Sequence, residues 1–351
     1  MDARACTGCL LGTAAGDALG LPYEGLTARR ASRLFPDKGR HHLLPGKGMV
    51  SDDTEHACLT ARALLLADGD VDRFGRELAS SLRWWLAGLP VGIGMATLRA
   101  VVKSCLGFPP ERSGVFSAGN GPAMRSAIIG VALGDSPGAL CDFVRRSTQL
   151  THTDPKAYQG ALAVAAAAHH GASRPVVSAG EFLQQLELLL EGESADEFIA
   201  LARKAASSAA KGEPVATFAE SIGSRGGISG YMFHTVPCVL QVWLSHPDDY
   251  AGGVRELIEA GGDTDTAAAI LGGIAGARNG KESIPQAWLG NILEWPRSMA
   301  WVEQLGLALA SDGARQGRSC PAYFVPGVAL RNLVFLVIVL AHGFRRLAPP
   351  Y

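Results

Sequence analysis

Residues 8–20 read Gly-Cys-Leu-Leu-Gly-Thr-Ala-Ala-Gly-Asp-Ala-Leu-Gly, an apolar stretch in which Gly8, Gly12 and Gly16 recur at every fourth position. At helical spacing these three glycines fall on one face and leave it bare of side chains. A glycine inside a helix costs up to about 1 kcal/mol relative to alanine, so three on one face indicate a packing or functional role. The stretch predicts a helix that a neighbouring helix approaches very closely.

A matching segment lies far along the chain. Gly272, Gly273 and Gly276 fall in the helix predicted after residue 266, and we expect the two glycine-rich helices to be partners at the centre of the molecule. Apolar helical stripes also occupy 54–67 and 156–169, while alternating strand patterns are nearly absent. The sequence therefore predicts an all-α fold.

The composition excludes several classes of function. The chain has 351 residues, 48% of them hydrophobic, a formal net charge of -1 and no basic run, so a nucleic-acid backbone is not an expected partner. Its seven cysteines are scattered, and Cys6 and Cys9 form a C-x-x-C without a second pair. We expect buried, reduced cysteines rather than a zinc site. The first residues lack a secretory pattern, which predicts a cytoplasmic protein.

The most apolar run lies near the C-terminus, from Leu333 to Ala341. It is about half of the roughly 20 residues that a membrane span requires, so it predicts a buried helix and no membrane association. We expect residues 298–351 to form a C-terminal helical extension packed on the body. This extension would cover a groove or make an oligomer contact, because so apolar a surface is seldom left exposed.

Two acidic clusters carry the candidate chemistry: Ser51-Asp52-Asp53-Thr54 and Gly261-Gly262-Asp263-Thr264-Asp265-Thr266. Each precedes a predicted helix, where one such residue would serve as a cap and acids suit the positive end of the helix dipole. Ligands that are all oxygen, without His or Cys, instead indicate a hard cation such as Mg²⁺, Mn²⁺ or Ca²⁺. If the clusters meet, their four carboxylates match the charge of two divalent ions. Capping and metal binding both stay open on the residues alone.

Six motifs occur in order from Gly8 to about Trp295: G-C-L-L-G-T-A-A-G-D-A-L-G-L-P-Y-E-G, S-D-D-T, G-N-G-P-A-M-R, T-H-T-D-P, S-G-Y-M-F-H-T-V-P and G-G-D-T-D-T. Together they resemble the ADP-ribosylglycohydrolase family. The resemblance implies a compact single-domain orthogonal helical bundle, with a catalytic domain over 1–297. It also implies a pair of Mg²⁺ (or Mn²⁺) ions.

The resemblance also implies roles for the acidic residues and their neighbours. Serine stands at 51, where threonine is more usual in the family, and keeps the hydroxyl. Glu24 matches a glutamate beside the metals that gates the site or touches the reacting ribose, although a surface-loop acid is the plainer interpretation. The matching metal-binding positions are Ser51, Asp52, Asp53, Asp263, Asp265 and Thr266.

Substrate-binding positions follow from the same resemblance. Gly119, Asn120, Gly121 and Met124 match the segment that wraps the diphosphate and the distal ribose, where free backbone N–H groups suit an anion. His152 matches a position beside the ribose and phosphates, although a lone histidine is often structural. Gly230 and Tyr231 resemble a loop that borders the ligand. Phe116 is a candidate surface for stacking adenine or, equally, a core residue.

The activity that the resemblance implies is hydrolysis of the glycosidic bond between ADP-ribose and an acceptor. Such bonds break through an oxocarbenium-like state, and Asp53 or Glu24 would be the general base for the water. The first expectation is ADP-ribosyl-arginine on a protein. Alternatives are ADP-ribosyl-serine, O-acetyl-ADP-ribose or a related ADP-ribosyl small molecule. A non-catalytic relative, either an ADP-ribose-binding or a crystallin-like structural protein, is a further alternative. Residues 25–50 form the loop expected to meet the acceptor.

Overall fold

The structure is a computed structural model that describes residues 1–311, 320–322, 324–347 and 349. Within these residues helices dominate, and the only strands are β1 (Leu26–Thr27) and β2 (Gly261–Gly262), which pair antiparallel. The predicted all-α fold is confirmed. The loop expected over 25–50 is partly regular, because β1 and the short helix α2 (Ala28–Leu34) lie in it.

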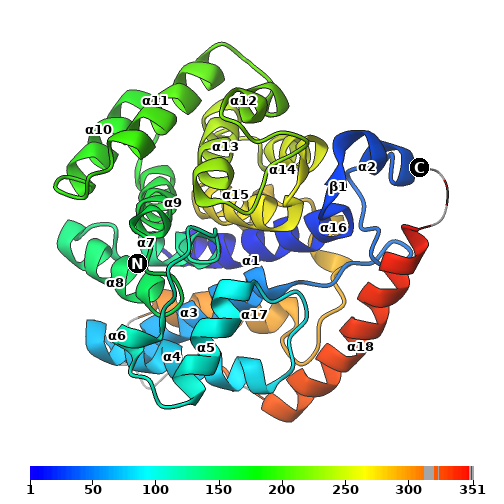
Figure 1. Ribbon diagram of the computed structural model, residues 1–351, viewed down its shortest axis with the longest axis horizontal. Coiled ribbons are helices and arrows are strands. Elements are labelled where there is room, and N and C mark those ends of the chain that lie inside the picture. The colour runs from blue at the N-terminus through cyan, green and yellow to red at the C-terminus, as the bar shows by residue number, and fades with distance from the viewer. Residues whose placement is uncertain (312–319, 323, 348, 350–351) are drawn as a thin grey trace.

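Two helices cross the centre of the molecule in contact, α1 (Ala3–Gly20) and α15 (Thr264–Asn279) (Figure 1). A Cβ atom built on Gly8 would lie 2.1 Å from the carbonyl oxygen of Gly276, and one on Gly12 would lie 2.1 Å from that of Gly272. No side chain fits between backbones at that separation. The glycines at every fourth position of α1 therefore serve close helix packing, as the sequence predicts.

The other helices surround this pair (Figure 1). The α-helices are α3 (Asp52–Ala67), α4 (Val71–Ala87), α5 (Met95–Cys105), α6 (Pro110–Ser113), α7 (Ala127–Leu133), α8 (Pro137–Gln149), α9 (Pro155–Ser173), α10 (Ala179–Leu189), α11 (Asp196–Ala210), α12 (Val215–Ser221), α13 (Met232–Ser245), α14 (Tyr250–Ala260), α16 (Gln286–Gly290), α17 (Met299–Ala310) and α18 (Val325–Arg345). Short 3₁₀ turns lie at Leu21–Tyr23, Ala123–Arg125 and Lys281–Ser283.

The cysteines only partly match the expectation. Cys6, Cys9, Cys58 and Cys238 are buried and free, as expected of reduced packing residues. Cys105 is exposed, and Cys141 and Cys320 are half-buried. Cys105 lies at the end of α5, Cys141 lies in α8 and Cys320 precedes α18. The spacing of the cysteines along the sequence did not reveal that these three are accessible to solvent.

The C-terminal helix α18 differs from its prediction in length and in burial. It runs for 21 residues rather than nine, because helical structure continues on both sides of the apolar run. By length and composition it is the one helix among the described residues that could cross a membrane, with 33% of its apolar window buried in the protein. Its inward side is hydrogen-bonded to the body through Arg331, Asn332 and His342.

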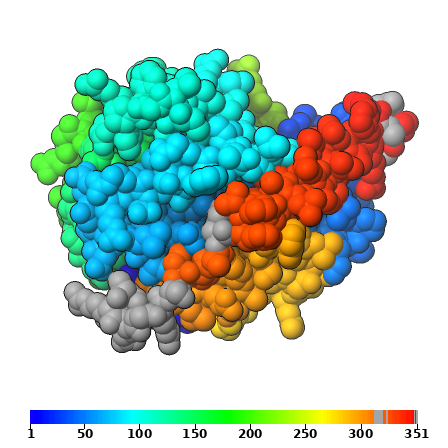
Figure 2. All heavy atoms as spheres, turned by 90° about the horizontal axis from the view of Figure 1, so that it is seen from below, coloured from blue at the N-terminus to red at the C-terminus, as the bar shows by residue number. Residues whose placement is uncertain are grey.

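The outward side of α18 corrects the expectation that the apolar run is buried. Leu333 is 51% exposed, Val337 65% and Leu340 52%. Figure 2 shows the helix, in orange to red, lying along one face with its outer side uncovered. The helix docks by a narrow stripe that also includes the buried side chains of Val328 and Phe335, and most of its other apolar side chains remain exposed.

Candidate functional site

The two acidic clusters lie side by side although they are 213 positions apart. Thr266 Oγ1, at the start of α15, donates a hydrogen bond to Asp53 Oδ2 at 3.3 Å. Ser51 Oγ, at the start of α3, donates to the same oxygen at 3.0 Å. The close packing of α1 against α15, with α3 beside them, brings the two helix N-termini together.

Asp17 is a member of this cluster that the sequence analysis missed. It is fully buried on α1, and its carboxylate accepts hydrogen bonds from Ser51 N at 2.9 Å and Thr54 N at 3.1 Å. Thr54 Oγ1 donates to it as well. Burial raises the pKa of Asp17 to about 6, against the opposing effect of these donors. A lone acid inside the apolar stretch 8–20 is the signal that could have identified it.

Two carboxylate oxygens in the cluster, Asp53 Oδ1 and Asp265 Oδ1, are buried without any hydrogen-bond partner. Burial raises the pKa of Asp53 well above its ordinary value, and the charge of Asp52 raises it further. Burial and then the charge of Glu24 do the same to the pKa of Asp265. Unpaired buried carboxylates are costly, and a hard cation is the partner that their oxygen chemistry fits.

As the side chains are placed, no group of three or more acidic, His or Cys side chains in the described part of the chain is arranged to hold a metal ion. Asn120 Nδ2 donates to Asp263 Oδ2 at 2.6 Å, and the hydroxyls of Ser51 and Thr266 donate to Asp53. These donors hold the carboxylates in their present positions.

The capping interpretation accounts for only part of the two clusters. Ser51 is the N-cap of α3 and its hydroxyl accepts from Asp53 N at 3.2 Å. Asp263 occupies the N-cap position of α15, but its side chain makes no capping hydrogen bond. Its carboxylate is instead directed toward Asn120, so capping does not explain the second cluster.

Two glycines direct Asp263 into the site. Gly261 and Gly262 have φ values of 75° and 89°, a region that favours glycine. A Cβ on Gly262 would lie 2.1 Å from the carbonyl oxygen of Ile228, and Gly25 N donates to Gly262 O at 2.7 Å. Three stretches of backbone meet here, which places the Glu24 loop next to Asp263.

A cavity of about 690 Å³ opens over this cluster, within the range of small-molecule sites. Most of the residues expected to bind metal or substrate line it. They are Glu24, Asp52, Asp263, Asp265, Thr266, Gly119, Asn120, Gly121, Met124, His152 and Gly230. Ser51 and Asp53 do not reach the lining and lie beneath it, both buried.

Glu24 stands in the cavity wall and remains accessible to solvent. Protein atoms nevertheless crowd its carboxyl, so desolvation raises its pKa, and the charge of Asp263 raises it further against the opposing charge of Arg346. A carboxylate with a raised pKa is a better proton acceptor than an ordinary one. Glu24 is therefore an exposed loop residue, as the plainer interpretation has it, and it also lines the cavity beside Asp263.

His152 lies directly beneath the glycine segment. Cβ atoms built on Gly119 and Gly121 would each stand 3.2 Å from its ring, so only glycine allows the backbone to rest there without displacement. Burial lowers the pKa of His152 to about 3, and Arg125 lowers it further, so the ring is neutral. Arg125 itself is fully buried and donates to Thr151 Oγ1 at 2.6 Å. His152 both supports the loop and faces the cavity.

The structure does not bring two expected residues to the cavity. Phe116 is 80% exposed, so it is neither a core residue nor part of the lining. Its neighbour Ser117 lines the cavity instead. Tyr231 pairs by its backbone with Gly119, but its hydroxyl binds Lys156 Nζ at 3.0 Å away from the lining.

The far wall of the cavity holds residues that the sequence analysis did not single out. They are Gly92, Gly94, Met95, Ala96, Thr97, Ser117 and the segment 225–229. Arg225 is the only Lys or Arg among the described residues that line the cavity. It lies in the loop Ser-Arg-Gly-Gly, in which both glycines after the arginine have a positive φ. A basic residue followed by two glycines was the signal available in the sequence.

An all-helical chain with a wide cavity over a floor of buried carboxylates defines a class of enzyme whose active site is built on acidic side chains. A family model for ADP-ribosylglycohydrolases matches residues 2–318. The chain belongs to the ADP-ribosylglycohydrolase family and is an ADP-ribosyl glycohydrolase, a hydrolase of linkages to ADP-ribose. The match includes α17 and ends before α18, and the boundary of the catalytic domain at residue 297 stays a prediction.

Similar proteins agree with this family. The chain is 31% identical to the ADP-ribosylhydrolase ARH3 of Bos taurus, over 80% of this chain and 86% of that protein. It is 26% identical to the ADP-ribosyl-[dinitrogen reductase] glycohydrolase of Rhodospirillum rubrum, over 81% and 89%. A solved ADP-ribosylglycohydrolase-related protein complex superposes with a TM-score of 0.64 at 27% identity, covering 89% of this chain and 98% of that one.

Proposed function

We propose that this chain is a metal-dependent hydrolase that releases ADP-ribose from arginine side chains of modified proteins. The observation that carries the metal dependence is the pair of buried, unpartnered oxygens of Asp53 and Asp265. Ser51, Asp52, Asp53, Asp263, Asp265 and Thr266 would hold two Mg²⁺ or Mn²⁺ ions. When bound, such ions neutralise the carboxylates, orient the ribose hydroxyls and make a nearby water more acidic.

The residues of the chain supply the rest of the reaction. Glu24 lines the cavity and has a raised pKa, so we assign it the role of general base, which accepts the proton of the attacking water. Asp53 lies beneath the lining with its Oδ2 bound to two hydroxyls, which suits a residue that orients the site rather than one that meets the water. The glycine segment around Asn120 would receive the diphosphate through backbone N–H groups.

The preference for arginine rests on charge. Asp52, Asp53, Asp263 and Asp265 match the charge of two divalent ions, and the two further carboxylates of Glu24 and Asp17 exceed the single positive charge of Arg225. A cationic guanidinium acceptor is favoured beside that excess over a neutral serine or acetyl ester. The names of the relatives specify no acceptor linkage, so ADP-ribosyl-serine, O-acetyl-ADP-ribose and related small molecules stay as alternatives.

A turnover assay on an acceptor panel tests this proposal. Chelator-stripped protein would be assayed with and without Mg²⁺ or Mn²⁺ on ADP-ribosyl-arginine, an ADP-ribosyl-serine peptide and O-acetyl-ADP-ribose. The proposal expects metal-dependent turnover, with the highest kcat/KM on ADP-ribosyl-arginine. A higher kcat/KM on another acceptor would overturn the arginine assignment. Full activity in chelator would overturn the metal dependence, and no turnover of any acceptor would leave a non-catalytic relative that only binds ADP-ribose.

A further inference from the structure

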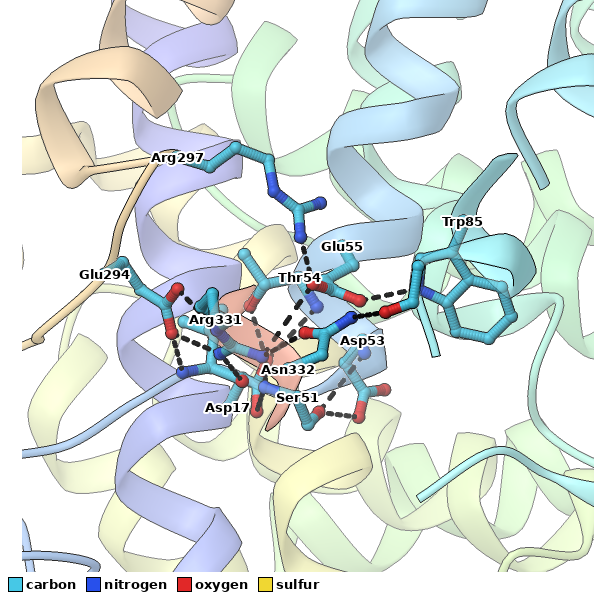
Figure 3. Close-up of polar contacts among 12 residues, drawn as sticks. Asp17, Ser51, Asp53, Thr54, Glu55, Trp85, Glu294, Arg297, Arg331 and Asn332 are labelled. Carbon is cyan, nitrogen blue, oxygen red and sulfur yellow. Dashed lines mark hydrogen bonds and ion pairs between the residues drawn. The ribbon is translucent and has the colours of Figure 1, made fainter. Parts of the chain in front are cut away.

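The C-terminal helix α18 lies directly behind the loops that carry Ser51 and Glu24. It begins at Val325, beyond residues 2–318 that the family model matches, so it is an addition to the part of the chain that defines the family. Figure 3 shows its residues Arg331 and Asn332 beside the start of α3, close to Glu294 and Ser51. Two separate sets of contacts connect the helix to the site.

The first set fixes the residue that precedes Ser51. Arg331 Nη2 donates to Val50 O at 2.6 Å, and Val50 N donates to Glu294 Oε1 at 2.9 Å. Arg331 Nε donates to Glu294 Oε2 at 3.0 Å, and both side chains are almost fully buried. One buried ion pair thus satisfies both main-chain polar groups of Val50. Charge-assisted bonds of this kind are stronger and more directional than neutral ones.

The same network continues into the first turn of α3. Glu55 is buried, and its carboxylate pairs with Arg297 and accepts from Trp85 Nε1 at 2.5 Å (Figure 3). Arg331 Nη1 stands 3.9 Å from Glu55 Oε1. Val50 and Glu55, on either side of the Ser51–Asp53 segment, are therefore both held by buried charged side chains, and Arg331 of α18 reaches both of them.

The second set of contacts reaches the Glu24 loop from the other end of α18. Arg346 Nη2 donates to the carbonyl oxygen of Glu24 at 2.7 Å. His342 Nε2 lies 3.1 Å from Pro22 O, and the ring stacks on Phe35. The backbone of the Glu24 loop is thereby fastened to the same helix that holds Val50.

We propose that α18 is a positioning element for the active site, with Arg331 as its principal positioning residue. The inference rests on the proposed function, since it assumes that Ser51–Asp53 and Glu24 form the working site. Arg331 contacts neither the cavity nor the carboxylates that would bind metal, so it acts through Val50 and Glu294. The planar fork of a guanidinium can bind Glu294 and Val50 O at once, which a lysine amine cannot do with the same geometry. Partners behind metal ligands orient them and contribute strongly to affinity.

Three variants of the full chain test the proposal. Arg331→Ala removes the fork, and Arg331→Lys keeps the charge but not the fork. Val328→Ala is the matched control, because Val328 is 1% exposed on the same helix and packs near Gly88 rather than at Val50. Amide hydrogen exchange of a peptide spanning 48–56 would be measured in metal-free protein by mass spectrometry. Mn²⁺ binding to stripped protein would be measured by electron paramagnetic resonance, and folding by circular dichroism.

We expect Arg331→Ala to exchange the 48–56 amides about tenfold faster, because local opening then costs less. We expect it to bind Mn²⁺ about 10–100-fold more weakly. Arg331→Lys should show the same changes to a smaller degree, and it carries the test if the alanine variant does not fold. Val328→Ala should lower Tm while leaving both measurements within about twofold of the parent.

Equal changes in Arg331→Lys and Val328→Ala at matched Tm would overturn the proposal and leave α18 as a structural cover only. Unchanged exchange in a folded Arg331→Ala protein would overturn it as well. If the parent protein binds no Mn²⁺, the metal dependence under the proposed function fails. The exchange measurement is made without metal and still decides the role of α18 in that case.

Discussion

Asp53 shows how the acidic cluster is arranged at the scale of single residues. One of its carboxylate oxygens accepts from two hydroxyls, and the other is buried without a partner. An asparagine would keep the shape and remove a buried charge that repels Asp52. The Asp53 side chain therefore destabilises the metal-free protein, and this is the reason to propose that it binds a cation.

We predict that Asp53→Asn raises the Tm of the metal-free protein or leaves it unchanged, and abolishes the stabilisation by metal. In the parent, free Mn²⁺ at about 100 times its Kd should add about 2.7 kcal/mol to the free energy of unfolding. Thermal melts with and without Mn²⁺ check both effects. A variant that metal stabilises as strongly as the parent would show that Asp53 is not a ligand.

Arg225 leads to a second residue-scale prediction. It is the only Lys or Arg among the described residues that line the cavity, and the proposed substrate carries a diphosphate. Arg225→Ala should raise KM for ADP-ribosyl-arginine about tenfold with little change in kcat, because the lost interaction is made equally in ground and transition states. A tenfold fall in kcat at constant KM would instead assign Arg225 to the chemical step.

At the scale of elements, the contact of α1 with α15 decides the architecture. A Cβ on Gly12 would lie 2.1 Å from Gly272 O, a backbone atom that cannot move alone. Gly12→Ala should therefore force the helices apart and destabilise the protein by about 3 kcal/mol or more, as overpacking does. Gly138→Ala in α8 is the control, since nothing lies within 4 Å of its added Cβ, and it should be neutral or stabilising by up to about 1 kcal/mol. Urea unfolding of both variants measures the difference, and equal effects would contradict the packing argument.

The outward side of α18 belongs to the same scale. Leu333 and Val337 are more than half exposed on a helix whose outer face carries no charge between Val325 and Phe344. We predict that this face makes an oligomer contact, because apolar surface of this extent usually meets a partner. Light scattering coupled to gel filtration should show a self-associating parent and a smaller species for the double variant Leu333→Ser, Val337→Ser. A monomeric parent at high concentration would rule out the contact.

At the scale of the whole molecule, the buried carboxylates connect stability to pH. Burial raises the pKa of Asp17 to about 6 and raises those of Asp52, Asp53 and Asp265 well above their ordinary values. The folded protein thus holds protons that the unfolded chain loses near pH 4. The raised pKa values of these carboxyl groups therefore stabilise the folded protein fully below about pH 4. This stabilisation is lost as the pH rises through 6.

We therefore predict that metal-free protein melts at a higher temperature at pH 5 than at pH 8. Metal should reverse the trend, since its ligands must be deprotonated, and the rise in Tm caused by Mg²⁺ should be larger at pH 8 than at pH 5. Melting curves in chelator and in excess Mg²⁺ across that range give the comparison. A rise in Tm that is equal at both values would show that metal and protons do not compete.

The sequence by itself determined the helical class, the pairing of two glycine-rich helices and the family. Each of these depends on local periodicity or on motifs in order, and both are properties of the chain read along its length. The cytoplasmic location and the absence of a membrane partner remain predictions from the same source. The acceptor stayed undetermined, because no motif distinguishes one ADP-ribosyl linkage from another.

Only the tertiary structure decided which residues meet. Asp17 joins the acidic cluster because close packing of α1 brings it under Ser51, and Arg331 reaches Val50 across 281 positions. Phe116 faces solvent, whereas its neighbour Ser117 lines the cavity. The apolar run of α18 is largely exposed because only one side of the helix, with Val328, Phe335 and its few polar residues, faces the body. Such contacts depend on the relative placement of whole elements, which no local pattern encodes.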